Sequence, residues 1–532
     1  MSSINKVRTR SPLSGGAHLN WMGGRSWDIT NPLTRLRVAA SSCFFGEPMY
    51  YHDDSAPASK RPGRARVSAL SAGDLSHLRD TLQAIDPVEW RGLAPAALME
   101  SAIDAALAHD PEGTLLEAAR LRNDEHIRAT PQVILVRAAN HAKVKGTGLV
   151  RRYAGDIVKR ADEPAVGLAY QLARYGKPVP NSLKRAWAGA LAATSDYALA
   201  KYRMESRGVK TVDVVNLVHA KSAAVNKLMK GELTVSGRTW EAIISAKGST
   251  KSAWSEAIGV MGHMALLRNL RNLLQAKVPV ERFAQKLLAG AKDGQQLPFR
   301  YYSAYRAVED LAPPALLDTI EACLETSLGA LPRFEGRVAS LCDNSGSAQG
   351  TTTSSLGSMK VSTIANLTGV LAGRCADEGW LGVFGDRLEM SQVRKKASVF
   401  DALKAAEASA RGIGMSTENG IWLFWDKAIR AKEHWDHVFV FSDMQAGHGG
   451  LYGTDRKAYK DFAWRGGSNI DVAKLIATYR AKVNPAVNVF LVQVAGYQDT
   501  IVPEFYDRTF ILGGWGEGLL RFAAAMNQLP RG

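Results

Sequence analysis

The sequence lacks the residue patterns that mark secreted, membrane-spanning and zinc-stabilised proteins. Its 532 residues include four cysteines, which are far apart and form no CxxC pair, so neither a zinc ribbon nor a disulfide framework is expected. No run of about 18 uninterrupted apolar residues occurs, and no apolar segment follows the basic residues near the N-terminus. We therefore expect no membrane span, no cleaved signal peptide, and a reducing, cytoplasmic setting.

Sequence motifs of common hydrolytic enzymes are also missing. The chain contains no GxxxxGK[ST] loop, no HExxH helix and no GxSxG turn, which disfavours hydrolysis of nucleotides, peptides or esters. With 46% hydrophobic and 22% charged residues, the composition is that of a globular protein. A single domain usually has about 100–200 residues, so we expect two or more domains.

Positive charge is concentrated in the middle of the chain. The formal net charge is +16, and residues 121–300 contain 30 Lys and Arg against 13 Asp and Glu. Residues 331–532 are nearly balanced, with 23 basic against 20 acidic residues. A run of charge is usually a solvated face, but an excess confined to one block is typical of a nucleic-acid-binding surface.

From about residue 70 to residue 330 the pattern predicts successive helices with few strands. Pro95, Pro111, Pro164 and Pro180 each stand before or within the first turn of an apolar-periodic segment, where a missing N–H group is tolerated. Helix after helix predicts a solenoid of helical pairs, although no strict repeat period is present.

One long helix is expected over residues 253–274. Apolar residues from Val260 to Leu274 recur at spacings of three and four, which predicts one buried stripe, with Arg268 on the more polar side.

After residue 333, short β-rich runs alternate with helical stretches such as 398–411 and 471–482. The runs are residues 337–342, 380–385, 388–393, 437–442, 487–494 and 508–513. This alternation predicts a doubly wound, mainly parallel α/β sheet, in which ligands bind at the carboxyl ends of the strands. We therefore expect an all-α domain over 1–333 and an α/β domain over 334–532.

A DxSxS motif directly follows the first of these runs. Asp343, Ser345 and Ser347 would bring one carboxylate and two hydroxyls together at a strand end, and Thr417 and Asp443 stand where further oxygen ligands are needed. Hard oxygen ligands suit Mg²⁺, with Mn²⁺ or Ca²⁺ as alternatives. A DxSxS segment is also compatible with a turn that caps the next helix, but its place in the α/β pattern favours a metal site.

This arrangement resembles the von Willebrand factor A domain with its metal-ion-dependent adhesion site. The resemblance implies that Asp343, Ser345 and Ser347 are direct or near-direct ligands and that Thr417 is a ligand in some states. It also implies that Asp443 binds directly or through water, and that an acidic group of a partner completes the coordination.

The N-terminal part resembles the TROVE module of the Ro ribonucleoprotein family, with the bacterial members as the nearest match. The resemblance covers the whole chain and rests on residues 26–51, 130–140, 179–191 and 264–274. It implies a closed ring of HEAT-like helical repeats, joined by the α/β domain, around a hole that admits single-stranded RNA. It further implies binding of small non-coding Y RNA and of single-stranded 3′ ends of misfolded RNA, and cooperation with a 3′→5′ exoribonuclease.

Basic residues of the central block are the expected contacts to RNA. Arg203 and Arg207 would share a helix face if their helix extends that far, and His219 and Lys221 match the neighbourhood that binds RNA in the family. The expected RNA-binding residues are Lys143, Lys145, Arg151, Arg152, Lys159, Lys201, Arg203, Arg207, His219, Lys221 and Arg268.

Three functions from different classes compete at this point. We favour a non-catalytic, monomeric RNA-binding scaffold. The alternative is a metal-dependent protein-adhesion scaffold whose basic helices bind RNA incidentally. A metal-dependent nuclease is disfavoured, because the sequence offers one adhesion-type site rather than the several carboxylates that hold two metals.

Overall fold

The structure is a computed structural model, and the chain divides into two compact units. The helical unit comprises Phe44–Met261 and Gln275–Val278, and the mixed unit comprises Met1–Cys43, Gly262–Leu274 and Pro279–Gly532. No helix among the described residues is long and apolar enough to cross a membrane. The structure describes residues 18–19, 25–42, 95–125, 127–204, 208–233, 239–294, 296, 298–329, 331–350, 360–416, 418–442, 444, 463–464, 469–494, 499–500, 508–513, 519–521 and 523–524.

The helical unit is built from short helices that pack on their near neighbours in sequence. Helix α5 packs on α6 and α7, α6 on α8, α7 on α9, and α11 on both α8 and α9. This stacking confirms the predicted succession of helices. The helices are α4 (Pro95–His109), α5 (Pro111–Asn123), α6 (Ala129–Asn140), α7 (Leu149–Ile157), α8 (Glu163–Arg174), α9 (Asn181–Ala192), α10 (Asp196–Lys201), α11 (Thr211–Val218), α12 (Ala223–Met229), α13 (Trp240–Lys247) and α14 (Lys251–Val260).

Proline and polar caps set where these helices begin. Pro95 and Pro111 are the first residues of α4 and α5, and Pro164 lies in the first turn of α8. The Asp110 carboxylate accepts a hydrogen bond of 2.9 Å from the N–H of Gly113, which satisfies one of the free N–H groups at the start of α5. The helix starts predicted from proline are confirmed.

The prediction of one long helix over residues 253–274 is wrong. Helix α14 ends at Val260, and α15 (His263–Arg268) and α16 (Leu270–Gln275) follow as separate short helices. Met261 and Gly262 both take extended conformations, and Val260, expected in the buried stripe, is 49% exposed. Glycine favours a helix poorly, and apolar spacing alone cannot show that the helix ends here.

The remaining helices before the sheet belong to the mixed unit. Tyr305 of α18 (Pro298–Val308) packs on Phe400 of α22 (Val399–Ala410), with ring centroids 4.2 Å apart, and Lys404 donates to the Tyr305 hydroxyl at 2.7 Å. The sheet itself begins at Phe334. Because these helices group with the sheet, the predicted domain boundary between residues 333 and 334 stays a prediction. These helices are α2 (Pro32–Ser42), α15, α16, η2 (Val280–Arg282), α17 (Ala284–Ala291), α18 (Pro298–Val308) and α19 (Pro314–Leu328).

A six-stranded sheet has the order β11-β9-β6-β3-β4-β5. All neighbouring strands are parallel except the edge strand β5, which runs antiparallel to β4. All six β-rich runs of the sequence are strands, so the predicted α/β class is confirmed. The strands are β3 (Phe334–Asp343), β4 (Ala376–Phe384), β5 (Leu388–Val393), β6 (His437–Ser442), β9 (Asn488–Gln493) and β11 (Thr509–Gly513).

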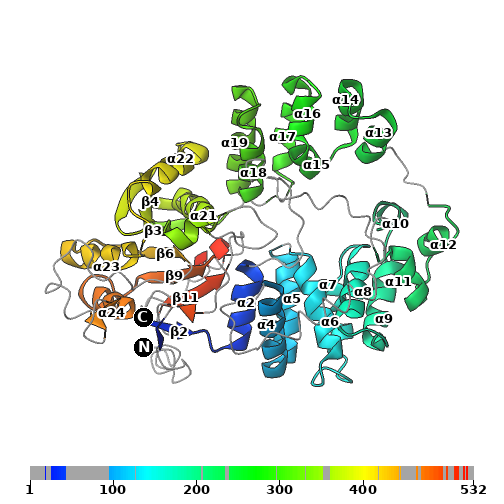
Figure 1. Cartoon of the computed structure of the whole chain (residues 1–532), viewed down its shortest axis with the longest axis horizontal. Coiled ribbons are helices and arrows are strands. Elements are labelled where there is room, and N and C mark those ends of the chain that lie inside the picture. The colour runs from blue at the N-terminus through cyan, green and yellow to red at the C-terminus, as the bar shows by residue number, and fades with distance from the viewer. Residues whose placement is uncertain are drawn as a thin grey trace. The chain divides into compact units, whose positions relative to one another are not determined.

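Helices cover both faces of this sheet. Figure 1 shows α21 (Val361–Cys375) and α22 (Val399–Ala410) on one side and α23 (Gly420–Ala431) and α24 (Val472–Lys482) on the other. Trp425 of α23 and Tyr479 of α24 are fully buried in the core on that second side. Burial of such large side chains fixes the sheet as a rigid platform for the loops at its ends.

A segment from the start of the chain completes the mixed unit. Strand β2 (Arg25–Asp28) pairs antiparallel with β10 (Asp499–Thr500), and α2 packs on β11. A Cβ atom at Gly513 would clash with the carbonyl of Val38, so glycine is needed where α2 approaches the strand. Short elements elsewhere in this unit are β1 (His18–Leu19), α20 (Gly346–Gly350), β7 (Ala463–Trp464) and β8 (Asn469–Ile470).

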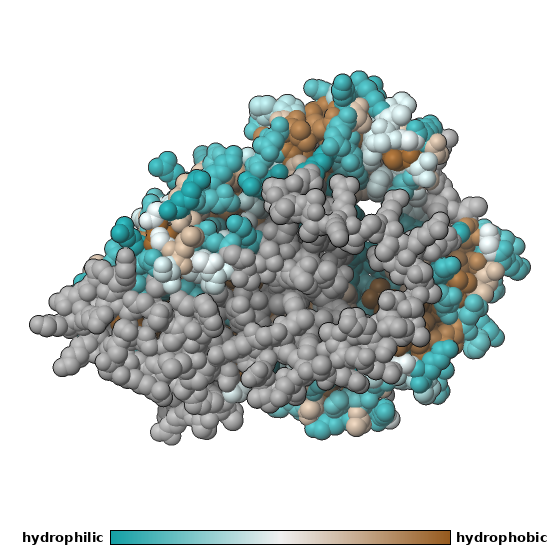
Figure 2. Space-filling model, viewed as in Figure 1, coloured by the Kyte–Doolittle hydropathy of each residue, from teal (hydrophilic) through white to brown (hydrophobic). Residues whose placement is uncertain are grey.

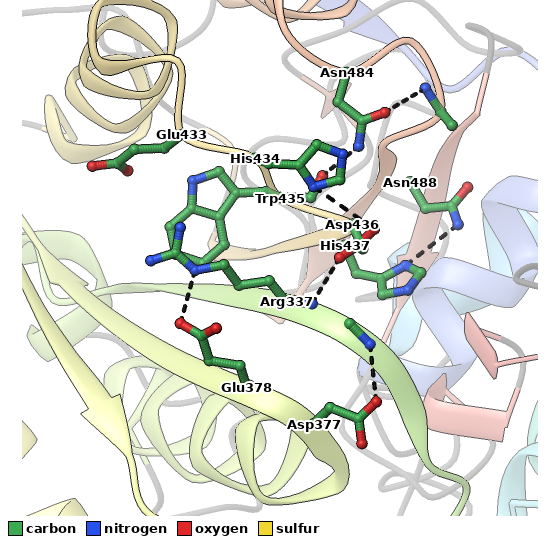
Figure 3. Close-up of polar contacts among 12 residues, drawn as sticks. Arg337, Asp377, Glu378, Glu433, His434, Trp435, Asp436, His437, Asn484 and Asn488 are labelled. Atoms are coloured by element: carbon green, nitrogen blue, oxygen red, sulfur yellow. Dashed lines mark hydrogen bonds and ion pairs between the residues drawn. The ribbon is translucent and has the colours of Figure 1, made fainter.

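Polar side chains at the amino ends of the strands bind one another (Figure 3). Arg337 donates from its side chain to Glu378 at 2.9 Å and from its backbone N–H to Asp436 at 2.8 Å. Its guanidinium lies 4.0 Å from the centre of the Trp435 ring, and His434 faces Asp436 at 3.9 Å. This end of the sheet is held together by its own charges, and the opposite, carboxyl end carries the candidate site.

Candidate functional site

The DxSxS loop lies at the carboxyl end of the central strand β3. Asp343 is the last residue of the strand and is fully buried, and its carboxylate accepts a hydrogen bond of 2.8 Å from the N–H of Ser345. The hydroxyl oxygens of Ser345 and Ser347 are 3.0 Å apart. The structure therefore brings the three predicted loop ligands together at the edge where α/β sheets bind ligands.

A pair of buried side-chain amides holds the DxSxS loop in place. The side chain of Asn344 exchanges two hydrogen bonds of 2.9 and 3.0 Å with that of Asn366, which lies on α21. The Asn344 side chain also donates to the carbonyl of Cys342. On its other side, the N–H of Gly346 donates to the carbonyl of Met415 at 2.7 Å. The loop after β3 is thus joined directly to the segment that leads to Thr417.

A second link joins the segments that contain the two remaining predicted ligands. Thr417 and Asp443 lie outside the described residues, but Glu418 and Ser442, which adjoin them in sequence, are both buried. The Ser442 hydroxyl donates to the Glu418 carboxylate at 2.7 Å and accepts from the N–H of Met444 at 2.8 Å. Glu418 is not among the predicted site residues, although its position directly after Thr417 in the sequence was a usable signal.

The donor set fits a hard cation such as Mg²⁺. The Asp343 carboxylate is fully buried, and a cation would offset the cost of burying its negative charge. Burial raises the pKa of the Cys342 thiol, and the Asp343 carboxylate raises it further. The thiol donates to the carbonyl of Ala365 at 3.2 Å. Within the described ranges, no group of three or more His, Cys, Asp or Glu side chains is arranged to hold a metal ion.

In the helical unit, five of the predicted RNA-binding residues lie between the end of α6 and the start of α8. They differ in how far their charges are engaged. Arg152 forms an ion pair of 2.7 Å with Glu112, and hydrogen bonds to Tyr153 and Glu112 raise the pKa of its guanidinium. Lys143 donates to the carbonyl of Ala108. The five are all exposed: Lys143, Lys145, Arg151, Arg152 and Lys159.

A second group surrounds helices α10 and α11. Lys201 ends α10 and is exposed, as are His219, which ends α11 with a left-handed φ of 52°, and Lys221. Arg203 is half-buried and donates to the carbonyl of Leu233.

Arg203 and Arg207 were expected to share a helix face if their helix extended that far, and it does not. Helix α10 ends at Lys201, so Arg203 lies beyond it, and Met204 has a left-handed φ of 59°. Arg207 is outside the described residues.

Arg268 is exposed on α15 and belongs to the mixed unit, unlike the described cations above. Roles in RNA binding remain predictions for all of these residues. On the face drawn in Figure 2, hydrophilic residues cover most of the described helical surface, and hydrophobic residues occur in small patches. Large side chains exposed on the helical unit include Tyr197 and Met229, at 47% and 43%.

Fold and site together define a class: a chain of packed helices followed by an α/β domain with a mainly parallel six-stranded sheet. Residues 222–314 match the family model of the TROVE domain. The fold is similar to the crystal structure of the Ro protein (RSR) of Deinococcus radiodurans, with a TM-score of 0.52 and 14% sequence identity over 93% of this chain and 99% of that chain. No curated protein matches.

These findings confirm two predictions. The TROVE match supports the resemblance to the Ro family seen in the sequence, and the structural likeness confirms the order of helical part and α/β domain. Closure of the helices into a ring stays a prediction.

Proposed function

We propose that this chain is a non-catalytic RNA-binding protein that acts as the scaffold of a ribonucleoprotein. The observation that carries the proposal is the TROVE match over residues 222–314, which overlaps the basic block of residues 121–300. Positive charge attracts the phosphate backbone whatever the sequence of the RNA, and helical repeats offer an extended surface for a polymer.

The finer proposal follows the resemblance to the Ro family. The ligands are small non-coding Y RNA and the single-stranded 3′ ends of structured or misfolded RNA. The chain acts as a monomer in the cytoplasm, where it takes part in RNA quality control with a 3′→5′ exoribonuclease. Exposed cations such as Lys145, Lys201 and Lys221 supply the backbone contacts.

The α/β domain has a separate role in this proposal. Asp343, Ser345 and Ser347, with Thr417 and Asp443, hold a divalent cation, preferably Mg²⁺, which supplies a binding position for an acidic group. The convergence of the three DxSxS side chains at the end of β3 supports this assignment.

The first experiment measures RNA binding by the full-length protein. The protein is first washed in high salt. Its affinity for a hairpin RNA with a single-stranded 3′ overhang is then compared with its affinity for the same hairpin with a blunt end. We expect tighter binding of the overhang, because threading requires a free single-stranded end. Absence of RNA binding would reject the proposal, and equal affinity for the two hairpins would reject its 3′-end component.

The salt dependence tests the basic surface. The slope of log affinity against log salt concentration is negative, and each contact to a phosphate of single-stranded RNA contributes about 0.7 to its magnitude. If Lys201 makes such a contact, Lys201→Ala should reduce the magnitude of the slope by about 0.7. Lys395→Ala is a matched control, because Lys395 is 48% exposed on the α/β domain and its ion pair with Asp377 is long, at 3.7 Å. An unchanged slope for Lys201→Ala would remove this residue from the RNA surface.

A further inference from the structure

We propose that helix α10 carries a stacking site for an unpaired nucleobase, with Tyr197 as the stacking side chain. This inference rests on the proposed function, since it takes RNA as the ligand. Tyr197 is 47% exposed, whereas Leu199 and Ala200 of the same helix are buried. One side of α10 is therefore held in the core while the tyrosine ring faces solvent.

The start of α10 is anchored, so the ring is presented from a fixed backbone. The Ser195 hydroxyl caps the helix by accepting the N–H of Ala198 at 3.3 Å, and Asp196 pairs with Lys227 of α12 at 2.7 Å. Helices α10 and α12 also pack on each other. An aromatic side chain has few rotatable bonds, so a base that stacks on such a ring orders little extra structure.

The charge beside the ring favours a polyanionic ligand. The Lys201 ammonium lies 5.8 Å from the centre of the Tyr197 ring and 5.6 Å from that of Tyr202, and it forms no ion pair with a described residue. Arg160 lies over the Tyr202 ring at 4.3 Å, but its guanidinium is bound by Asp162 at 2.9 Å. Lys201 is thus the available cation between two aromatic rings.

An exposed ring beside an available ammonium matches what a single-stranded nucleotide requires. The flat face of any base stacks on an aromatic ring, and a lysine next to it reaches the phosphate. Removal of a stacking aromatic typically weakens binding by about 5-fold or more per base. A protein partner could use the same ring, but it would give no preference for a base over an abasic site.

The test measures affinity of the full-length protein for a fluorescent single-stranded oligouridine by anisotropy at fixed salt. We expect Tyr197→Leu to weaken binding at least about 5-fold and Tyr197→Phe to stay within about 2-fold, because stacking needs the ring and not the hydroxyl. The salt slope should not change in either variant. The affinities of Tyr197→Leu and of the parent protein should differ less for an oligomer with abasic positions than for the intact oligomer, because an abasic position has no base to stack.

Tyr175→Leu is the matched control. Tyr175 is 36% exposed, but the cation near its ring, Arg137, is itself buried and paired with Asp104. We expect this variant to bind like the parent. If the parent binds RNA and Tyr197→Leu binds it with unchanged affinity, the stacking site is overturned and the proposed function is not. Equal losses of affinity in Tyr197→Leu and Tyr175→Leu would overturn the stacking site in the same way. Absence of RNA binding by the parent would overturn the proposed function as well.

Discussion

Replacement of Ser442 by alanine should destabilise the α/β domain more than a buried serine-to-alanine change usually does. The Ser442 hydroxyl is fully buried at the end of β6 and donates to the Glu418 carboxylate at 2.7 Å. The same oxygen accepts the N–H of Met444 at 2.8 Å. One oxygen atom therefore serves two buried groups.

The expected loss follows from these two bonds. A hydrogen bond to a charged group contributes about 1.5–3 kcal/mol, and a neutral one about 1 kcal/mol. Together they predict that Ser442→Ala lowers the free energy of unfolding by about 2–4 kcal/mol. For a domain of this size, that corresponds to a fall in Tm of roughly 5–15 °C.

The neighbouring strand supplies a matched control. Ser340 of β3 is also fully buried, but its hydroxyl has no hydrogen-bond partner among the described residues. Ser340→Ala removes the same atom from the same sheet and should change the stability by less than about 1 kcal/mol. Urea unfolding followed by tryptophan fluorescence reports on this domain, because Trp422, Trp425 and Trp435 are buried in its core. Equal losses in the two variants would refute the assigned bond to Glu418.

Three further changes probe the metal site, a buried thiol and the packing of α23. Asp343→Ala should abolish the stabilisation by Mg²⁺, which is about 2.7 kcal/mol at 100 times Kd, and leave RNA affinity within a few-fold; thermal unfolding with Mg²⁺ and parallel RNA titration check both parts. Burial raises the pKa of Cys375 from 9.0 to about 11, so its contribution to stability should be complete below pH 9 and be lost as pH rises towards 11. Alkylation of Cys375 at pH 8.5, read by mass spectrometry, should therefore require unfolding. Gly420→Ala should cost about 1–3 kcal/mol or more, because a Cβ there would clash with Phe384, whereas the exposed Gly412→Ala, with its nearest atom at 3.6 Å, should change the urea midpoint little.

The α/β sheet was predictable because several of its strands contain short continuous apolar runs. A parallel strand buried on both faces needs apolar residues at nearly every position, and residues 437–442 and 508–513 show this pattern. The strands observed are His437–Ser442 and Thr509–Gly513, within one residue of the expected limits. The position of the DxSxS loop followed, since Asp343 directly ends the first run.

The contacts that hold the loops together were not predictable. Glu418 and Ser442 are 24 residues apart, and neither local propensity nor apolar periodicity reports a hydrogen bond across that separation. The break between α14 and α15 escaped for a similar reason. The spacing of apolar residues continues through Met261 and Gly262, while tertiary packing decides which side of each short helix is buried.

Charge counting located the basic region but could not rank its members. Arg152 and Lys201 carry the same formal charge, yet Arg152 is paired with Glu112 at 2.7 Å while Lys201 forms no ion pair with a described residue. A phosphate that approaches Arg152 must compete with a carboxylate already in place, whereas one that approaches Lys201 displaces only water and counterions. Arg203 differs again, because its guanidinium is bound to the Leu233 carbonyl from a half-buried position. If the chain binds RNA as proposed, we therefore expect single strands to bind best where a cation without an ion pair lies beside an exposed aromatic ring, and not simply where the net charge of the block is high.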